Sequence, residues 1–427
     1  MENKKLENLD LTVYHDKCTN GLDIYVIPNN KVNNVYATLT SKYGSRINEF
    51  VPIGENKMIK VPEGVAHFLE HKMFEQKNGI DPFTFYSNNG ASANANTSYY
   101  KTTYLFDGPN NVKENIEFLL DYVQDPYFTD ENVEKEKGII IQEYEMYQDN
   151  PYSRGYECLL KNAFINDAIK YPIVGTKQSI NSITKEDLYK CYNTFYHPSN
   201  MFLVVTGNVE PKEIIDLVNL NQNNKSFEKE KKIDIKKIKE PNNINKDYEE
   251  IKMNITIPKV FIGYKINLSK VKNISKAKII NYICIYFEML FGLTSKCLED
   301  LRNNGKLHTN IELDFAEADD NLLFVISAET ENYDYFIKYV DEIILNSQFT
   351  EEEFNRKKKN LIGSLISMSD NIFSINYKIM SNIIRYNTII YDDYNNIESL
   401  NINECNCLIN NISLKNKTVC VIKSTNK

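Results

Sequence analysis

The 427-residue sequence has few of the residues that build disulfide frameworks or Cys-ligated metal sites, and it has no long apolar run. Its eight cysteines are scattered without a CxxC pair, which is typical of reduced thiols in a large intracellular chain. The first fifteen residues, MENKKLENLDLTVYH, lack the apolar stretch of a signal peptide. We therefore expect a cytoplasmic protein.

The longest apolar-rich run extends from Ile279 to Leu293, and Asn281 and Glu288 interrupt it. A membrane-spanning helix needs about 20 predominantly apolar residues, so this run is too short. It predicts a buried core helix and no membrane span.

Composition and charge exclude several classes of protein. Hydrophobic residues make up 42% and charged residues 25%, which is ordinary for a globular protein and excludes a disordered chain, a collagen and a disulfide miniprotein. The net charge of −8 offers no general attraction for nucleic acid or anionic lipid. The length predicts two or three domains.

A polar segment divides the sequence into two parts with a similar order of predicted elements. Residues 221–247 carry many charged residues and almost no large apolar ones, which is typical of a linker. The predicted organisation is therefore a half over residues 1–220, a linker over 221–247 and a second half over 248–427. In each half, strand-like runs alternate with helical periodicities.

The five histidines include one pair with a spacing that favours metal binding. His67 and His71 lie four residues apart, and Glu70 immediately precedes the second, giving H-x-x-E-H. Positions i and i+4 are neighbours on a helix, so both imidazoles can ligate one Zn²⁺. Glu70 lies beside the same face, where a carboxylate can move a proton from zinc-bound water to a leaving amine. The alternative is a pair of surface histidines, but the neighbours are apolar and favour a partly buried helix: Val65, Phe68, Leu69 and Met73.

A third ligand has to come from elsewhere, because a catalytic zinc takes three protein ligands and keeps one position for water. The segment from Val133 to Pro151 carries Glu136 and Glu143 seven residues apart, on one face of a predicted helix. One carboxylate can bind the metal while the other orients a ligand histidine. The alternative is that both are ordinary solvated charges.

Three segments resemble the pitrilysin-type (inverzincin, M16) zinc metallopeptidases, in particular the small bacterial members of peptide-maturation systems. They are GVAHFLEHKMFE, VEKEKGIIIQEYEMYQDNP and CYNTFYHPSNMFLVVTGNVEP. The resemblance implies one zinc per chain held by His67, His71 and Glu143, with Glu70 as the base and Glu136 behind a ligand. The gap between His71 and Glu143 is slightly shorter than is usual in the family, which we attribute to a shortened loop near residue 110. Glu145 is the alternative ligand.

The segment GASANANTSYYKTTY resembles the substrate-binding edge strand of the family. Asn94, Ala95 and Thr97 match its positions, which implies that they contact the peptide. An exposed strand edge accepts an extended peptide through main-chain hydrogen bonds. The alternative is an ordinary strand of small residues.

The second half departs from the family pattern, in which an Arg and a Tyr seven residues later bind the peptide. Arg302 is present, but Thr309 stands seven residues later and His308 six. The resemblance then implies a heterodimer with a zinc-less sister subunit that supplies the missing group. The alternative is a homodimer in which His308 replaces the Tyr.

These observations predict an α+β protein of two similar halves, each a mostly antiparallel sheet with helices packed on one face. The expected function is zinc-dependent cleavage of short or unfolded peptides, including a precursor or leader peptide. Two other functions remain open: a non-catalytic scaffold subunit of a processing-peptidase-like complex, and a zinc-binding interaction module.

Overall fold

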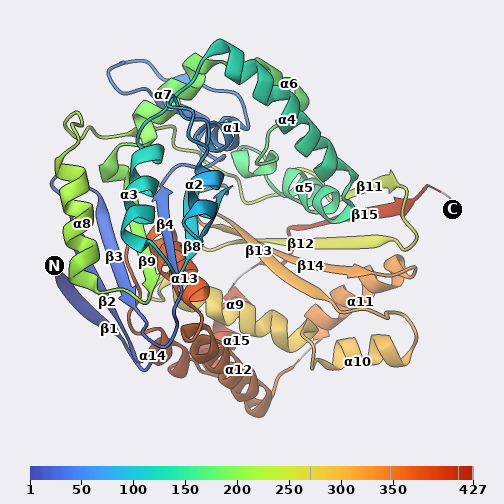
Figure 1. Ribbon diagram of the computed structural model, residues 1–427. Helices are drawn as coiled ribbons and strands as arrows, with labels where there is room; N and C mark the ends of the chain where they lie inside the picture. The colour runs from blue at the N-terminus through green and yellow to red at the C-terminus, as the bar shows by residue number, and fades with distance from the viewer. Residues whose placement is uncertain (270, 347, 412, 426–427) are drawn as a thin grey trace. The chain divides into compact units, whose positions relative to one another are not determined.

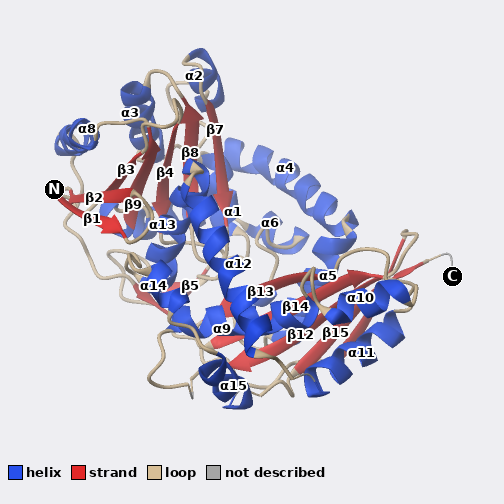
Figure 2. Ribbon diagram, turned by 90° about the horizontal axis from the view of Figure 1, so that it is seen from below, coloured by secondary structure: helices blue, strands red, loops and turns tan. Residues whose placement is uncertain are grey.

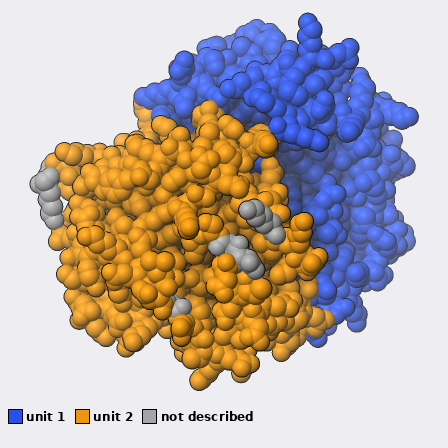
Figure 3. All heavy atoms as spheres, turned by 180° about the vertical axis from the view of Figure 1, so that it is seen from behind, with its two compact units in different colours: residues 1–144, 172–237, 365–393 blue, residues 145–171, 238–364, 394–427 orange. Residues whose placement is uncertain are grey.

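The computed structural model describes residues 1–269, 271–346, 348–411 and 413–425. Runs of strands and runs of helices follow one another along the chain (Figure 1). The chain forms two compact units, each assembled from three segments (Figure 3). Unit 1 comprises residues 1–144, 172–237 and 365–393, and unit 2 comprises residues 145–171, 238–364 and 394–427.

Unit 1 is built on a seven-stranded sheet with β7 at one edge (Figure 2). Among its paired strands only β3 and β9 run parallel. The order is β1 (Glu2–Leu6), β2 (Leu11–Lys17), β3 (Asp23–Pro28), β9 (Met201–Gly207), β4 (Val35–Ser41), β8 (Thr102–Gly108) and β7 (Ser92–Thr97). A small second sheet contains β10 (Asp234–Ile235), β5 (Glu49–Val51) and β6 (Ile59–Lys60).

Most helices of unit 1 contribute to one apolar core on one face of the large sheet. They are α1 (Val65–Lys72), α2 (Pro82–Asn88), α3 (Val112–Val123), α6 (Lys177–Ser182), α7 (Lys185–Phe195) and α8 (Pro211–Asn223). The long helix α4 (Asp130–Asp149) starts in this unit and ends in unit 2. Alternate strand residues such as Ala37 and Leu39 point into this core, as expected for a sheet with one buried face.

The other face of the sheet is covered by α13 (Ile372–Tyr386), which comes from late in the sequence. Its buried Asn376 accepts a hydrogen bond from Thr38 Oγ1 at 2.7 Å. Its amide donates to the carbonyl of Val204 at 3.0 Å. The amide side chain therefore fixes α13 on β4 and β9, because a buried polar group stays only where it finds partners.

Unit 2 contains a five-stranded sheet in which only β11 and β15 run parallel. The order is β11 (Tyr248–Met253), β15 (Lys417–Ser424), β12 (Lys259–Asn267), β14 (Asn321–Glu329) and β13 (Glu312–Ala318). The helices are α5 (Pro151–Ala163), α9 (Lys276–Phe291), α10 (Lys296–Asn303), α11 (Tyr333–Asn346), α15 (Ile402–Asn411), most of α12 (Glu351–Ser369) and most of α14 (Asp393–Glu398). The predicted α+β class with mostly antiparallel sheets is confirmed.

Helix α5 packs on β12 and β15 with a close approach at Gly155. A Cβ added there would lie 2.0 Å from the ring of Phe261, so only glycine fits. On the other face of this sheet, Phe287 of α9 stacks on Phe324 with ring centroids 3.7 Å apart. The seven-stranded and the five-stranded sheets thus carry helices on both faces, whereas the sequence predicts helices on one face of each sheet.

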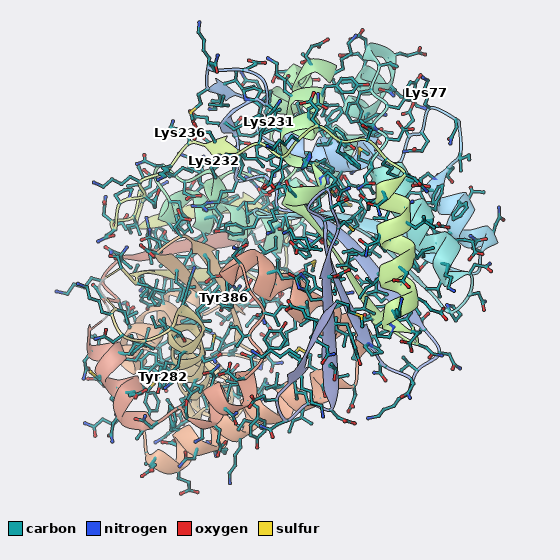
Figure 4. The ribbon with its side chains drawn as sticks, turned by 90° about the vertical axis from the view of Figure 1, so that its left-hand side faces the viewer. Lys77, Lys231, Lys232, Lys236, Tyr282 and Tyr386 are labelled. Carbon is teal, nitrogen blue, oxygen red and sulfur yellow. The ribbon has the colours of Figure 1, made fainter. Side chains whose placement is uncertain are left out.

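The division predicted from the sequence, at residues 1–220, 221–247 and 248–427, does not coincide with the two units. Helix α5 lies before the polar segment yet packs in unit 2, and α13 lies after it yet packs in unit 1. The polar segment itself contains the end of α8 and strand β10, which pairs with β5. Lys231, Lys232 and Lys236 lie along this segment (Figure 4).

Residues Lys276–Asn303 form one stretch of the described chain that is long and apolar enough to cross a membrane by length and composition. Of its most apolar window, 61% is buried in the protein. The stretch is divided into α9 and α10, and the apolar side chains of α9 face the core. Such burial is typical of the core helix that the sequence predicts.

A buried ion pair fixes the end of the polar segment in unit 2. The Lys265 and Glu240 side chains are 0% and 4% exposed, and Nζ lies 2.6 Å from Oε1. Glu240 also accepts backbone N–H bonds from residues 165, 166 and 167 at 2.8–2.9 Å. Burial alone would raise the pKa of Glu240, but the bonds from Lys265 and these amides lower it.

We expect Glu240→Ala to lower the free energy of unfolding by about 3–5 kcal/mol, because it leaves the Lys265 ammonium buried without its counter-charge. Urea denaturation followed by circular dichroism measures the change. The matched control Glu230→Ala removes an exposed charge from the same segment and should change stability by less than about 0.5 kcal/mol. If adding Lys265→Met to Glu240→Ala recovers no stability, the unpaired charge is not the cause.

Candidate metal centre

The helix that carries the H-x-x-E-H motif is short and largely buried. Pro62 and Gly64 precede α1, and Gly64 has φ of 90°. A Cβ at Gly64 would lie 2.4 Å from the carbonyl oxygen of residue 174, so this helix entry requires glycine. His67 and Glu70 are each 7% exposed among the apolar side chains of α1, so the motif is not on a solvated face.

The structure brings His67, His71 and Glu143 together. Glu143 lies on α4, with one carboxylate oxygen 3.6 Å from His67 Nε2 and the other 3.4 Å from His71 Nε2. One donor atom from each of the three residues lies within 4.8 Å of the others. Donor atoms of a tetrahedral zinc site with bonds of about 2.0–2.1 Å lie about 3.4 Å apart. The donor set and its spacing therefore fit a zinc ion.

Glu136 lies on α4, two turns before Glu143, and contacts the far side of one ligand ring. Its Oε1 is 3.0 Å from His71 Nδ1. A carboxylate that accepts the Nδ1 proton fixes the ring and leaves Nε2 free to bind a metal. The contact agrees with the role that the family resemblance implies for Glu136, which the spacing of the two glutamates alone leaves open.

The two histidines differ in their affinity for protons. Burial, followed by the neighbouring His71, lowers the pKa of His67 to about 4, so its ring is neutral and ready to ligate. Burial would also lower the pKa of His71, but hydrogen bonds to Glu136 and Glu143 raise it to about 9. A metal ion must therefore displace a proton from His71, because only neutral imidazole is a ligand.

Buried His67 Nδ1 has no hydrogen-bond partner in the structure. A buried polar atom without a partner is uncommon. His67 therefore differs from His71, whose Nδ1 contacts Glu136.

Glu70 faces the neighbouring strand. Thr97 Oγ1 on β7 donates a hydrogen bond to Glu70 Oε2 at 2.5 Å. Burial raises the pKa of Glu70, while the Thr97 hydrogen bond and the charge of His71 oppose this rise. Thr97, which the sequence assigns to peptide binding, thus contacts the predicted base directly.

The other predicted peptide-binding residues lie in two different units. Asn94 and Ala95 are on β7, the edge strand, where Asn94 is exposed and Ala95 is half-buried. Arg302 is on α10 in unit 2 and donates to Asn310 Oδ1 at 2.7 Å. Arg302, His308 and Asn310 line a cavity of about 490 Å³ in this unit.

The alternative ligand Glu145 lies outside the group of donor atoms and is exposed. Glu134 forms an ion pair with Lys137 at 2.5 Å on the outer side of α4. One buried group near the site was not predicted, the ammonium of Lys101 at the end of the β7–β8 hairpin. No motif or periodicity marks it, because a lysine in a polar hairpin loop is ordinarily exposed.

Two family matches cover consecutive parts of the sequence. Residues 40–177 match the family described as "Insulinase (Peptidase family M16)". Residues 182–361 match "Peptidase M16 inactive domain". The first match contains His67, His71 and Glu143, and the second covers a part of the chain that lacks H-x-x-E-H.

The uncharacterized zinc protease YmfH of Bacillus subtilis is 42% identical over 364 residues, covering 84% of each chain. Human mitochondrial-processing peptidase subunit beta is 30% identical over 158 residues, which are 36% of this chain and 32% of that protein. The crystal structure of an M16-like peptidase from Alicyclobacillus acidocaldarius superposes with a TM-score of 0.92 at 28% identity, covering 98% of this chain and 100% of that one.

The family match and the zinc proteases among the relatives place the chain among the metallopeptidases. The protein belongs to peptidase family M16, as the sequence predicts.

We expect Glu143→Gln to weaken zinc binding by more than about 100-fold and Glu136→Gln by about 10–100-fold, because the first removes a ligand and the second only its support. Competition with a zinc-binding dye measures both. Glu145→Gln is the control and should bind zinc as the unmodified protein does. If Glu145→Gln lost zinc and Glu143→Gln retained it, Glu145 would be the ligand instead of Glu143.

Proposed function

We propose that the protein is a zinc-dependent endopeptidase of the H-x-x-E-H type that cleaves short or unfolded peptides, including a precursor or leader peptide. The observation that carries this proposal is the convergence of Glu143 on His67 and His71, with Glu70 buried beside them. The zinc proteases among its relatives support the same class of activity.

The roles follow from the positions of the side chains. A zinc ion held by His67, His71 and Glu143 would supply a Lewis acid for the scissile carbonyl and would make a water molecule more acidic. Glu70 is placed to accept a proton from the attacking water and to give it to the leaving amine. Thr97 holds Oε2 of Glu70, so the carboxylate keeps one orientation through both proton transfers.

The free edge of β7 is the proposed place for the peptide. Strand β7 pairs only with β8 within the described sheet, so its outer backbone groups can bind an extended chain. Asn94 and Ala95 line that strand, and small side chains let a peptide backbone approach closely. The contact between Thr97 and Glu70 joins this edge to the proposed base.

We expect Glu70→Gln to lower kcat for an unfolded peptide by about 10²–10⁴-fold with zinc still bound, since the amide cannot accept the proton. Peptide cleavage followed by mass spectrometry and one zinc per chain by metal analysis test this expectation. Glu134→Gln is the matched control on α4 and should leave kcat unchanged. Cleavage that persists in Glu70→Gln would remove Glu70 from the role of base.

A sister subunit is the proposed partner, because unit 2 has Arg302 but Thr309 where the family has its Tyr. The relative named as a subunit of the mitochondrial-processing peptidase supports a multi-subunit assembly. The alternative is a homodimer, in which His308, beside Arg302 in the unit 2 cavity, takes the place of the Tyr. We also propose a cytoplasmic location, because the eight cysteines are scattered without a CxxC pair, as is typical of reduced thiols.

We expect the isolated chain to cleave peptides slowly and to gain activity, about tenfold or more in kcat/KM, when mixed with a homologous chain that lacks H-x-x-E-H but carries both the Arg and the Tyr. The physical reason is that one more hydrogen-bond donor stabilises the tetrahedral intermediate. Size-exclusion chromatography with activity measurements tests the pairing. Full activity of a pure homodimer, lost in His308→Ala, would favour the alternative.

Two other functions make different predictions. A scaffold subunit would hold the same fold without cleavage, and a zinc-binding interaction module would keep zinc without needing Glu70. The buried Glu70 with its raised pKa and its Thr97 contact supports the enzyme, because neither alternative requires a carboxyl in that environment.

A further inference from the structure

Lys101 is buried at the end of the β7–β8 hairpin, next to the edge strand. It is 8% exposed, which is rare for a lysine. The hairpin loop packs closely against the backbone at Gly44, where an added Cβ would lie 2.5 Å from the Lys101 backbone nitrogen. Ser45 N also donates to Ser98 O at 3.0 Å. The lysine is therefore fixed by its backbone.

The ammonium has only neutral hydrogen-bond acceptors. Nζ donates to Asn96 Oδ1 at 3.2 Å and to Thr103 Oγ1 at 3.1 Å. No carboxylate in the described part of the chain lies within ion-pair distance of it, in contrast to Lys265, which is paired with Glu240. Burial lowers the pKa of Lys101 to about 8, opposed by the charge of Glu70, so at neutral pH it is still largely charged. A buried charge of this kind is costly unless a partner arrives.

The pairing of β7 with β8 places Lys101 on one particular face of the sheet. Thr97 pairs with Thr102, and their side chains lie on the face of Glu70. Asn96 pairs with Thr103, and the side chains of both point to the opposite face, where Lys101 contacts them. A peptide added to β7 would project every second side chain to this second face.

We propose that Lys101 selects peptides with an acidic side chain, Asp or Glu, at the position that lies beside Asn96 on that face. This inference rests on the proposed peptidase function and names its substrate class. An ammonium has three donors, and the two neutral acceptors leave one for the carboxylate. Asn96 is exposed, so the incoming side chain meets its amide and the Lys101 ammonium beneath it.

The test uses the full-length, zinc-loaded chain and sets of peptides that differ only by Glu, Gln or Lys at successive positions around the cleaved bond. We expect one position at which kcat/KM is about tenfold higher for Glu than for Gln and lowest for Lys, since charge-assisted hydrogen bonds are roughly twice as strong as neutral ones. Lys101→Met should reduce the Glu-to-Gln ratio to near one.

Two further variants complete the test. Asn96→Asp gives the Lys101 ammonium a carboxylate from the protein itself and should remove the preference for Glu over Gln peptides. Because it leaves Lys101 in place, it tests the proposal even if Lys101→Met does not fold. Lys113→Met removes an exposed lysine on α3 and should leave the ratio unchanged. A ratio that survives Lys101→Met or Asn96→Asp, or the absence of any Glu preference, would overturn the proposal.

A binding measurement separates this inference from the proposed function. Fluorescence anisotropy with labelled Glu and Gln peptides compares Glu70→Gln with Glu70→Gln/Lys101→Met. If the unmodified chain cleaves no peptide, the peptidase function fails. A Glu preference in binding that disappears with Lys101→Met would still support the role of Lys101, and equal binding of both peptides would refute it.

Discussion

The contact on which the proposed chemistry depends is the approach of one carboxylate, Glu143, to two imidazoles on another helix. Helix α1 can present His67 and His71 together because they lie one turn apart. It can keep them there only because its apolar residues are buried and Gly64 lets its first turn pass close to residue 174. Helix α4 then supplies both the third donor and, two turns earlier, Glu136 behind His71. A small rotation of either helix would separate these groups, so the packing of the core determines the chemistry of the site.

The two units treat buried lysines in opposite ways. In unit 2 the ammonium of Lys265 has a carboxylate and two backbone carbonyls, which satisfy its three donors and fasten the polar segment to the sheet. In unit 1 the ammonium of Lys101 has only an amide oxygen and a hydroxyl beside a strand whose outer edge is free. Burial of a charge costs free energy in both places. The Lys265 charge is compensated within the protein by Glu240. The Lys101 charge has only neutral acceptors, so its surroundings favour an anionic partner.

Much of the fold follows from local patterns in the sequence, and the remainder has identifiable causes. The periodicities predict the central strands and the helices over residues 111–124 and 129–147, because those segments bury one face against a single core. The sequence pattern over residues 351–385 predicts one helix, but the structure has two, α12 and α13, because the Asn371 side chain accepts a hydrogen bond from the Ser374 backbone N–H and caps the start of α13. The sequence could not predict that α5 packs in unit 2 and α13 in unit 1. A helix has the same amphipathic pattern whether it covers a sheet of its own half or of the other half.

The sequence by itself indicates a zinc site, because helical geometry lets the H-x-x-E-H spacing bring two histidines to one face and lets Glu136 and Glu143 share another. It also determined the class of fold and the family. The tertiary structure decided which glutamate meets the histidines, that Thr97 contacts Glu70, and that Lys101 is buried with no carboxylate of the described residues within ion-pair distance. These features arise from contacts between segments that lie about 30 to 70 residues apart in the sequence. A local sequence pattern does not determine how closely two such segments pack.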